Sequence, residues 1–136
     1  MNRRTARKSV DAQHGQARLA KARGYREQAH TLVILMRDGT DGSSAVSLMV
    51  SAVIAYADAL TAIKAGMVNQ QDHARVVDLV RDVMGNAFPR TQENGLRKLL
   101  SRKDEAQYGT RAVPVGVARD LFAHLETFGD WVESLL

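Results

Sequence analysis

Cysteine is absent from this sequence of 136 residues, and aromatic residues are scarce at 5%. Without cysteine the chain forms no disulfide, no thiolate metal site and no cysteine nucleophile. This absence favours an intracellular protein, and we expect a cytoplasmic location. With so few aromatic side chains, the core must be built from Ala, Val, Leu, Ile and Met, which favours closely packed helices.

Long apolar runs are also missing. The most apolar stretch, residues 43–63, is interrupted by Asp58, so we expect no membrane-spanning segment and no membrane partner. The basic N-terminus is not followed directly by an apolar stretch, which argues against a secretory signal. A chain of this length fits one domain and can bury a proper core.

Basic residues are concentrated near the N-terminus. Residues 1–37 contain nine Lys and Arg residues against two acidic residues, whereas the remainder contains ten basic and thirteen acidic residues. A local excess of positive charge is typical of a segment that contacts phosphates, but it is equally typical of a solvated arm and helix face. The charge pattern alone leaves both interpretations open.

The apolar periodicity predicts an all-α fold, an up-and-down bundle of about five helices. Residues 1–10 are predicted to be a basic flexible arm, and residues 11–136 a single helical-bundle domain. We predict helices over 11–37, 43–65, 69–84, 91–101 and 114–135, with a loop over 102–113. The second of these is apolar nearly all round, so we expect it to lie at the centre of the bundle.

The sequence lacks the usual motifs of metal, cofactor and covalent chemistry. Its four histidines are not spaced three or four residues apart, so histidine alone forms no helical metal clamp. There is no Walker A motif, no G-x-G-x-x-G, and no strand-to-helix elbow for a serine nucleophile. We therefore predict no metal site and no cofactor.

Three segments resemble the HEPN superfamily, helical domains of higher eukaryotes and prokaryotes named for nucleotide binding. Residues 99–109, LLSRKDEAQYG, place basic residues and a tyrosine shortly before the last predicted helix. The Ala-rich segment 52–60, AVIAYADAL, and then 72–74, DHA, precede them in the family's order. The resemblance covers residues 20–134.

Many HEPN proteins are metal-independent ribonucleases that use Arg and His in the pattern R-x4–6-H across a homodimer, and many belong to toxin–antitoxin or phage-defence systems. The matching loop here contains Arg102, Lys103 and Tyr108 but no histidine. Tyrosine, with a pKa near 10, is a poor general base at neutral pH. The resemblance therefore implies binding of RNA or a nucleotide by these three residues without catalysis, a homodimer, and an antitoxin partner.

Weaker site candidates lie elsewhere. Arg119 and His124 are five residues apart in the last predicted helix, about 140° apart around its axis. Arg23 and Arg26 lie in the basic N-terminal segment. Two alternatives to a binding module stay open: a metal-independent endoribonuclease, and a structural protein–protein interaction domain whose second or last helix pairs with another chain.

Overall fold

The computed structural model describes residues 7–136 and is an all-α bundle, as the periodicity predicts. Two short strands, one near the start of the chain and one after the second helix, pair with each other, and a 3-10 turn, η1 (Gly85–Ala87), joins two of the helices. The elements in chain order are β1 (Arg7–Ser9), α2 (Ala12–Leu35), α3 (Ser43–Ala65), β2 (Met67–Asn69), α4 (Ala74–Met84), α5 (Arg90–Leu100), α6 (Lys103–Tyr108) and α7 (Val115–Leu135).

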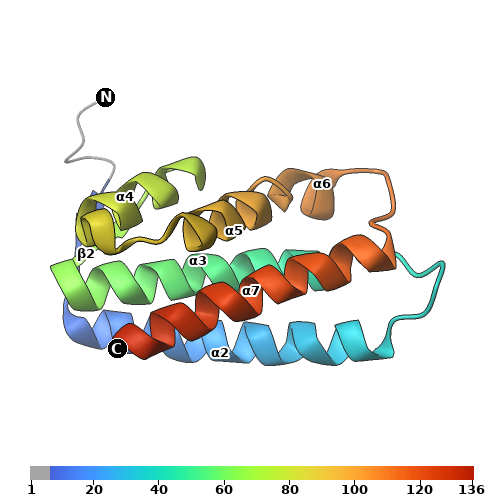
Figure 1. Ribbon diagram of the computed structural model, residues 1–136, viewed down its shortest axis with the longest axis horizontal. Helices are drawn as coiled ribbons and strands as arrows, with labels where there is room; N and C mark the ends of the chain where they lie inside the picture. Colours follow the sequence, from blue (N-terminus) through green and yellow to red (C-terminus); the bar gives the residue numbers. More distant parts are fainter. Residues whose placement is uncertain (1–6) are drawn as a thin grey trace.

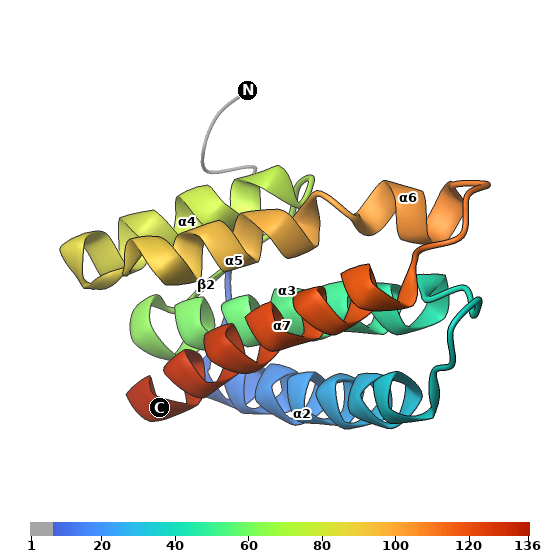
Figure 2. The same cartoon turned by 45° about the vertical axis from the view of Figure 1, so that its right-hand side comes forward.

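The helices form three layers (Figure 1). Helices α3 and α7 pack against each other in the middle, α2 covers one side of them, and α4, α5 and α6 cover the other. In both views the α2–α3 loop and the segment leading into α7 lie at the same end of the bundle (Figures 1 and 2). Helix α7, which packs on α3, thus has α2 on one side and α5 on the other.

Helix α3 is the centre of the core, as its sequence predicts. It contacts α2, α4, α5, α6 and α7, and more than half of its residues are buried. By length and composition alone α3 would be long and apolar enough to span a bilayer, but 67% of its most apolar window is buried inside the bundle. Its central position in the fold accounts for its apolar sequence.

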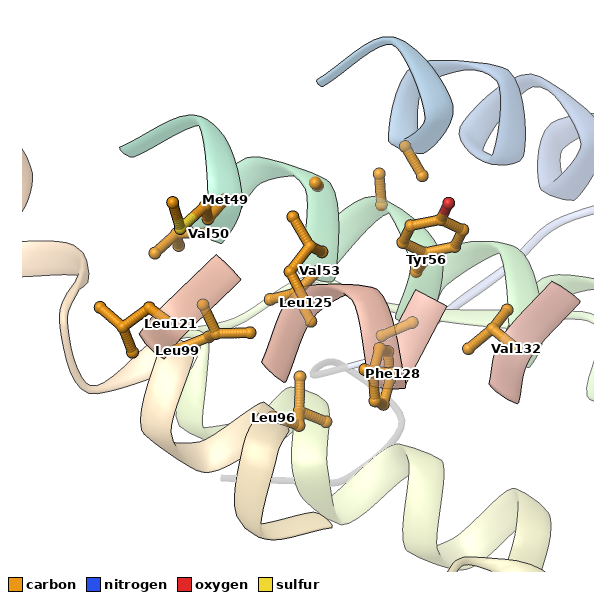
Figure 3. Close-up of a cluster of buried hydrophobic side chains, with 14 of the residues drawn as sticks. Met49, Val50, Val53, Tyr56, Leu96, Leu99, Leu121, Leu125, Phe128 and Val132 are labelled. Atoms are coloured by element: carbon orange, nitrogen blue, oxygen red, sulfur yellow. The ribbon is translucent and has the colours of Figure 1, made fainter. Parts of the chain in front are cut away.

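A cluster of large core side chains comes from α3, α5 and α7 (Figure 3). Each buried Leu, Phe or Met contributes about 1.5–3 kcal/mol relative to an exposed one, so this cluster holds α7 between its two neighbours. The cluster contains Met49, Val50, Val53, Tyr56, Leu96, Leu99, Leu121, Leu125, Phe128 and Val132.

The predicted third helix begins later than expected. Residues 69–84 were predicted to be helical, but Asn69 ends strand β2 and α4 begins only at Ala74. The side-chain amide of Asn69 donates to the carbonyl oxygens of Gln71, at 3.0 Å, and Asp72, at 3.2 Å. These bonds close a local turn that competes with the helix.

The predicted loop over 102–113 contains the short helix α6. Asp104 and Glu105 lie in its first turn, where acidic side chains interact favourably with the helix dipole. A helix of six residues has too few apolar positions to show a periodicity, which explains why the sequence pattern missed it.

Part of the predicted flexible arm is paired. Residues 7–9 form β1, which lies antiparallel to β2 with Lys8 opposite Val68. A guanidinium nitrogen of Arg7 lies 2.6 Å from a carboxylate oxygen of Asp82 on α4. Residues 1–6 of the predicted arm lie outside the described residues.

Candidate nucleic-acid interface

The predicted phosphate-binding residues lie on and next to α6. Arg102 immediately precedes the helix and is half-buried, whereas Lys103 begins it and Tyr108 ends it. Nζ of Lys103 lies 5.5 Å from the centre of the Tyr108 ring, and Tyr108 is 75% exposed. The structure thus brings a cation and an exposed aromatic ring together, a combination that contacts phosphates and bases in single-stranded nucleic acids.

His73, which precedes α4, lies near this segment although it is thirty residues from Lys103 in the sequence. Its Nδ1 atom is buried and has no hydrogen-bond partner within residues 7–136. Burial lowers the pKa of the imidazole, and the positive charge of Lys103 lowers it further, against the opposing effect of Asp72 and Asp104. The sequence pattern did not point to this proximity because the two residues are brought together only by the fold.

A groove of about 810 Å³ runs between α5 and α7. The lining side chains are basic or neutral polar, with no Asp or Glu among them: Thr91, Asn94, Arg97, Lys98, Ser101, His124 and Thr127. Arg97 forms an ion pair with Glu93, one turn earlier in α5, with a guanidinium nitrogen 3.2 Å from a carboxylate oxygen. The ammonium group of Lys98 has no ion pair or hydrogen bond among the residues that the structure describes.

The local sequence of α5 explains why its cations line this groove. Leu96 and Leu99 are fully buried in the core, so Arg97 and Lys98 between them point outward. Gly95 is also buried, and a Cβ atom placed there would lie 3.4 Å from Nδ1 of His124. The backbone of α5 thus lies next to His124, which forms part of the α7 wall.

The predicted pair of Arg119 and His124 is not brought together. A guanidinium nitrogen of Arg119 donates to the carbonyl oxygen of Met36, just after α2, at 3.4 Å. His124 lies on the other side of α7, against α5. His124 is therefore a candidate binding residue, but with Arg97 and Lys98 in place of Arg119.

The arginines of the basic N-terminal segment are largely paired with acidic residues from later in the chain. Nε of Arg23 donates to Glu133 at 3.0 Å, and Arg26 donates to Asp130 at 2.8 Å. Closer to the start of α2, Nε of Arg18 donates to Asp58 at 3.1 Å. The charge of these three arginines is thus compensated in the folded protein, whereas Lys21 of the same segment has no ion pair among the described residues.

No group of three or more His, Asp or Glu side chains is placed to hold a metal ion within residues 7–136. No protein-family model matches the sequence, and no curated protein matches it. The resemblance to the HEPN superfamily therefore stays a hypothesis, and function has to be argued from the surfaces of this molecule.

Proposed function

We propose that this protein is a HEPN-like module that binds nucleic acid in the α5–α7 groove and does not cleave it. The observation that supports this proposal is the composition of the groove, which contains Arg97, Lys98 and His124 but no lining carboxylate. Cationic side chains supply the salt-sensitive attraction to phosphates that dominates the affinity of such proteins. Hydroxyl and amide groups in the same groove provide donors and acceptors for bases and sugars.

The α6 segment extends this surface along the chain. Ser101, at one end of the groove, is followed directly by Arg102 and Lys103, and the exposed ring of Tyr108 closes the segment. In this proposal the groove holds the phosphate backbone, and Tyr108 stacks on a base. The arginines of α2 contribute little because acidic side chains already neutralise them.

Fluorescence anisotropy with a short labelled RNA, measured at two salt concentrations, tests the proposal. The wild-type protein should bind weakly and lose affinity as salt increases. Lys98→Glu reverses one charge in the groove and should weaken binding about tenfold or more. Lys21→Glu makes the same charge change on the exposed surface of α2 and should have a much smaller effect.

Two outcomes would contradict this assignment. If Lys98→Glu and Lys21→Glu reduced RNA affinity equally, only net charge would matter and the groove would not be the site. An absence of binding at low salt would reject nucleic-acid binding altogether and favour the alternative of a protein–protein interaction domain.

A metal-independent ribonuclease is the second candidate, favoured by His73 lying near Lys103. We expect no cleavage, because Nδ1 of His73 is buried and the loop that resembles the family's motif contains Tyr108, a poor general base at neutral pH, and no histidine. Incubating labelled RNA with the purified protein in EDTA tests this expectation. Cleavage that is abolished by both Arg102→Ala and His73→Ala would establish the enzyme reading instead.

The family resemblance also leads us to propose a homodimer and an antitoxin partner. Ile34 and Leu35, adjacent at the end of α2, are 65% and 69% exposed, and exposed apolar side chains of this size are common at interfaces. Light scattering should return the mass of a dimer. A monomer at tens of micromolar would reject the dimer, and purification from the native host would reveal a bound antitoxin.

A further inference from the structure

A second pocket, of about 310 Å³, lies on the side of α7 that faces α2. It is separate from the α5–α7 groove, with which it shares no lining residue. Tyr56 of α3 lies beneath it, fully buried. A cavity of this volume is at the lower end of the range that small-molecule ligands occupy.

The polar groups at the base of this pocket satisfy one another. The hydroxyl of Tyr56 donates to Glu133 at 3.1 Å and accepts from Arg26 at 3.3 Å. Glu133 also accepts from Arg23, and Arg26 also donates to Asp130. Neither arginine is therefore free to receive an anionic ligand without losing an ion pair.

The walls have a different character, because each helix contributes one ring and one carboxylate. On α2, Glu27 and His30 are three residues apart, and on α7, Phe122 and Glu126 are four apart, so each pair shares a helix face. The rings of His30 and Phe122 stack across the two helices, with centroids 5.3 Å apart and planes 9° apart. His30 is exposed, so this stacked pair offers a ring surface at the pocket.

The two wall carboxylates have no partner. Within residues 7–136, the side chains of Glu27 and Glu126 make no ion pair and no hydrogen bond. The charges of Arg23 and Arg26 are already balanced by Glu133 and Asp130, so the pocket carries two uncompensated negative charges beside an aromatic surface. Phe122 is 6% exposed, so the imidazole of His30 is the ring surface at the pocket. The apolar chain of an organic cation can lie against this ring while its charged ends pair with the carboxylates, whereas a hydrated metal ion has no such chain.

We propose that the α2–α7 pocket binds a small organic dication of the polyamine class. Its two cationic groups would lie against Glu27 and Glu126, and its body would lie against the stacked rings of His30 and Phe122. The site does not depend on the nucleic-acid groove, so either proposal can fail alone.

Agmatine, which carries a guanidinium and an ammonium group, is the probe. Its binding to the full chain is followed by the shifts of backbone amide signals in NMR spectra at low salt. Agmatine should bind saturably and shift the signals of residues around His30 and Phe122, whereas Mg²⁺ at equal concentration should bind more weakly. The double variant Glu27→Gln with Glu126→Gln should weaken agmatine binding about tenfold, and both positions are exposed and unpaired, so the fold should persist.

A matched control changes the same charge elsewhere. Asp104→Asn with Glu105→Gln removes two exposed carboxylates from α6 and should change agmatine binding by less than about twofold. His30→Ala should also weaken agmatine binding by removing the stacked ring. The proposal is overturned if agmatine binding does not saturate by about 10 mM or if Mg²⁺ binds equally well. It is also overturned if the control double variant loses as much agmatine affinity as the pocket double variant.

Discussion

The two sides of helix α7 differ in how their cations are placed. On the side of α2, Arg23 and Arg26 are paired with Glu133 and Asp130. On the side of α5, Lys98 lines a groove that has no lining carboxylate. The basic excess of the sequence lies in the first region, where the arginines next to α7 are paired, whereas Lys98 in the second region has no ion pair among the described residues. A count of charges along the chain therefore does not locate a phosphate-binding surface, because pairing decides which cations are free.

The comparison predicts that the α2 side is important for stability and the α5 side for binding. Tyr56→Ala removes a fully buried ring and leaves Glu133 and Arg26 without its hydroxyl, so it should lower the free energy of unfolding by about 3–5 kcal/mol. Urea denaturation measures this loss. Tyr108→Ala removes an exposed ring and should change stability by less than about 0.5 kcal/mol while weakening RNA binding.

A third substitution separates packing from hydrogen bonding at the same position. Tyr56→Phe keeps the ring and removes only the hydroxyl, so it should cost about 1 kcal/mol. If Tyr56→Ala and Tyr108→Ala destabilised the protein equally, the α2 side would not be the structural side of α7, and the comparison would be wrong.

The parts of the fold that could be predicted depend on local signals. The prediction that α3 is the central helix, made from its apolar sequence, is confirmed. Gly66 and Gly85 follow the ends of α3 and α4, with positive φ angles of 67° and 55°. A glycine with a positive φ angle after a helix can be predicted locally, since glycine itself permits the conformation. The predicted beginning of α4 was wrong, because the side chain of Asn69 makes hydrogen bonds that the apolar periodicity of the sequence does not reveal.

The candidate site was harder to predict because its contacts are long-range. Arg23 and Glu133 are 110 residues apart, so nothing near Arg23 in the sequence indicates that its charge is compensated. His124 was named as a candidate, but with Arg119, whose side chain reaches the end of α2. The combination of His124 with Arg97 and Lys98 depends on the packing of α5 against α7.

The ion pairs on the α2 side also predict a pH dependence. The hydrogen bond from Arg23, followed by that from Tyr56, lowers the pKa of Glu133 below its ordinary value of 4.5. Because the folded state favours the carboxylate, this contribution is fully present above pH 4.5 and is lost as the pH falls through the lower folded pKa. Glu133→Gln should therefore reduce stability at pH 7 and reduce the loss of stability between about pH 5 and pH 3.

Urea unfolding of both proteins across this pH range measures the difference between them. Glu126→Gln serves as the control, because Glu126 lines the same pocket but has no partner among the described residues. Its unfolding free energy should follow the wild-type pH profile. A Glu133→Gln profile parallel to that of the wild type would show that the ion pair contributes nothing to the acid sensitivity.

A further prediction compares two glycines, Gly129 on the α2 side of α7 and Gly95 on the α5 side. A Cβ atom at Gly129 would lie 2.8 Å from a ring carbon of Tyr56 and 2.9 Å from a guanidinium nitrogen of Arg26, so Gly129→Ala should cost about 1–3 kcal/mol. At Gly95 a Cβ atom would lie 3.4 Å from Nδ1 of His124, an ordinary contact. Gly95→Ala should therefore stabilise α5 by about 0.5–1 kcal/mol through helix propensity.

The methyl group of Gly95→Ala would also contact His124, which lines the groove, and we expect RNA affinity to fall by about two- to threefold. Thermal unfolding and anisotropy on the same preparation give both values. A variant that gains stability and loses affinity would separate packing from binding at a single position, as the comparison requires. If Gly95→Ala instead destabilised the protein as much as Gly129→Ala, α5 and α7 would be packed as tightly as α2 and α7. There would then be no open groove in which a nucleic acid could bind.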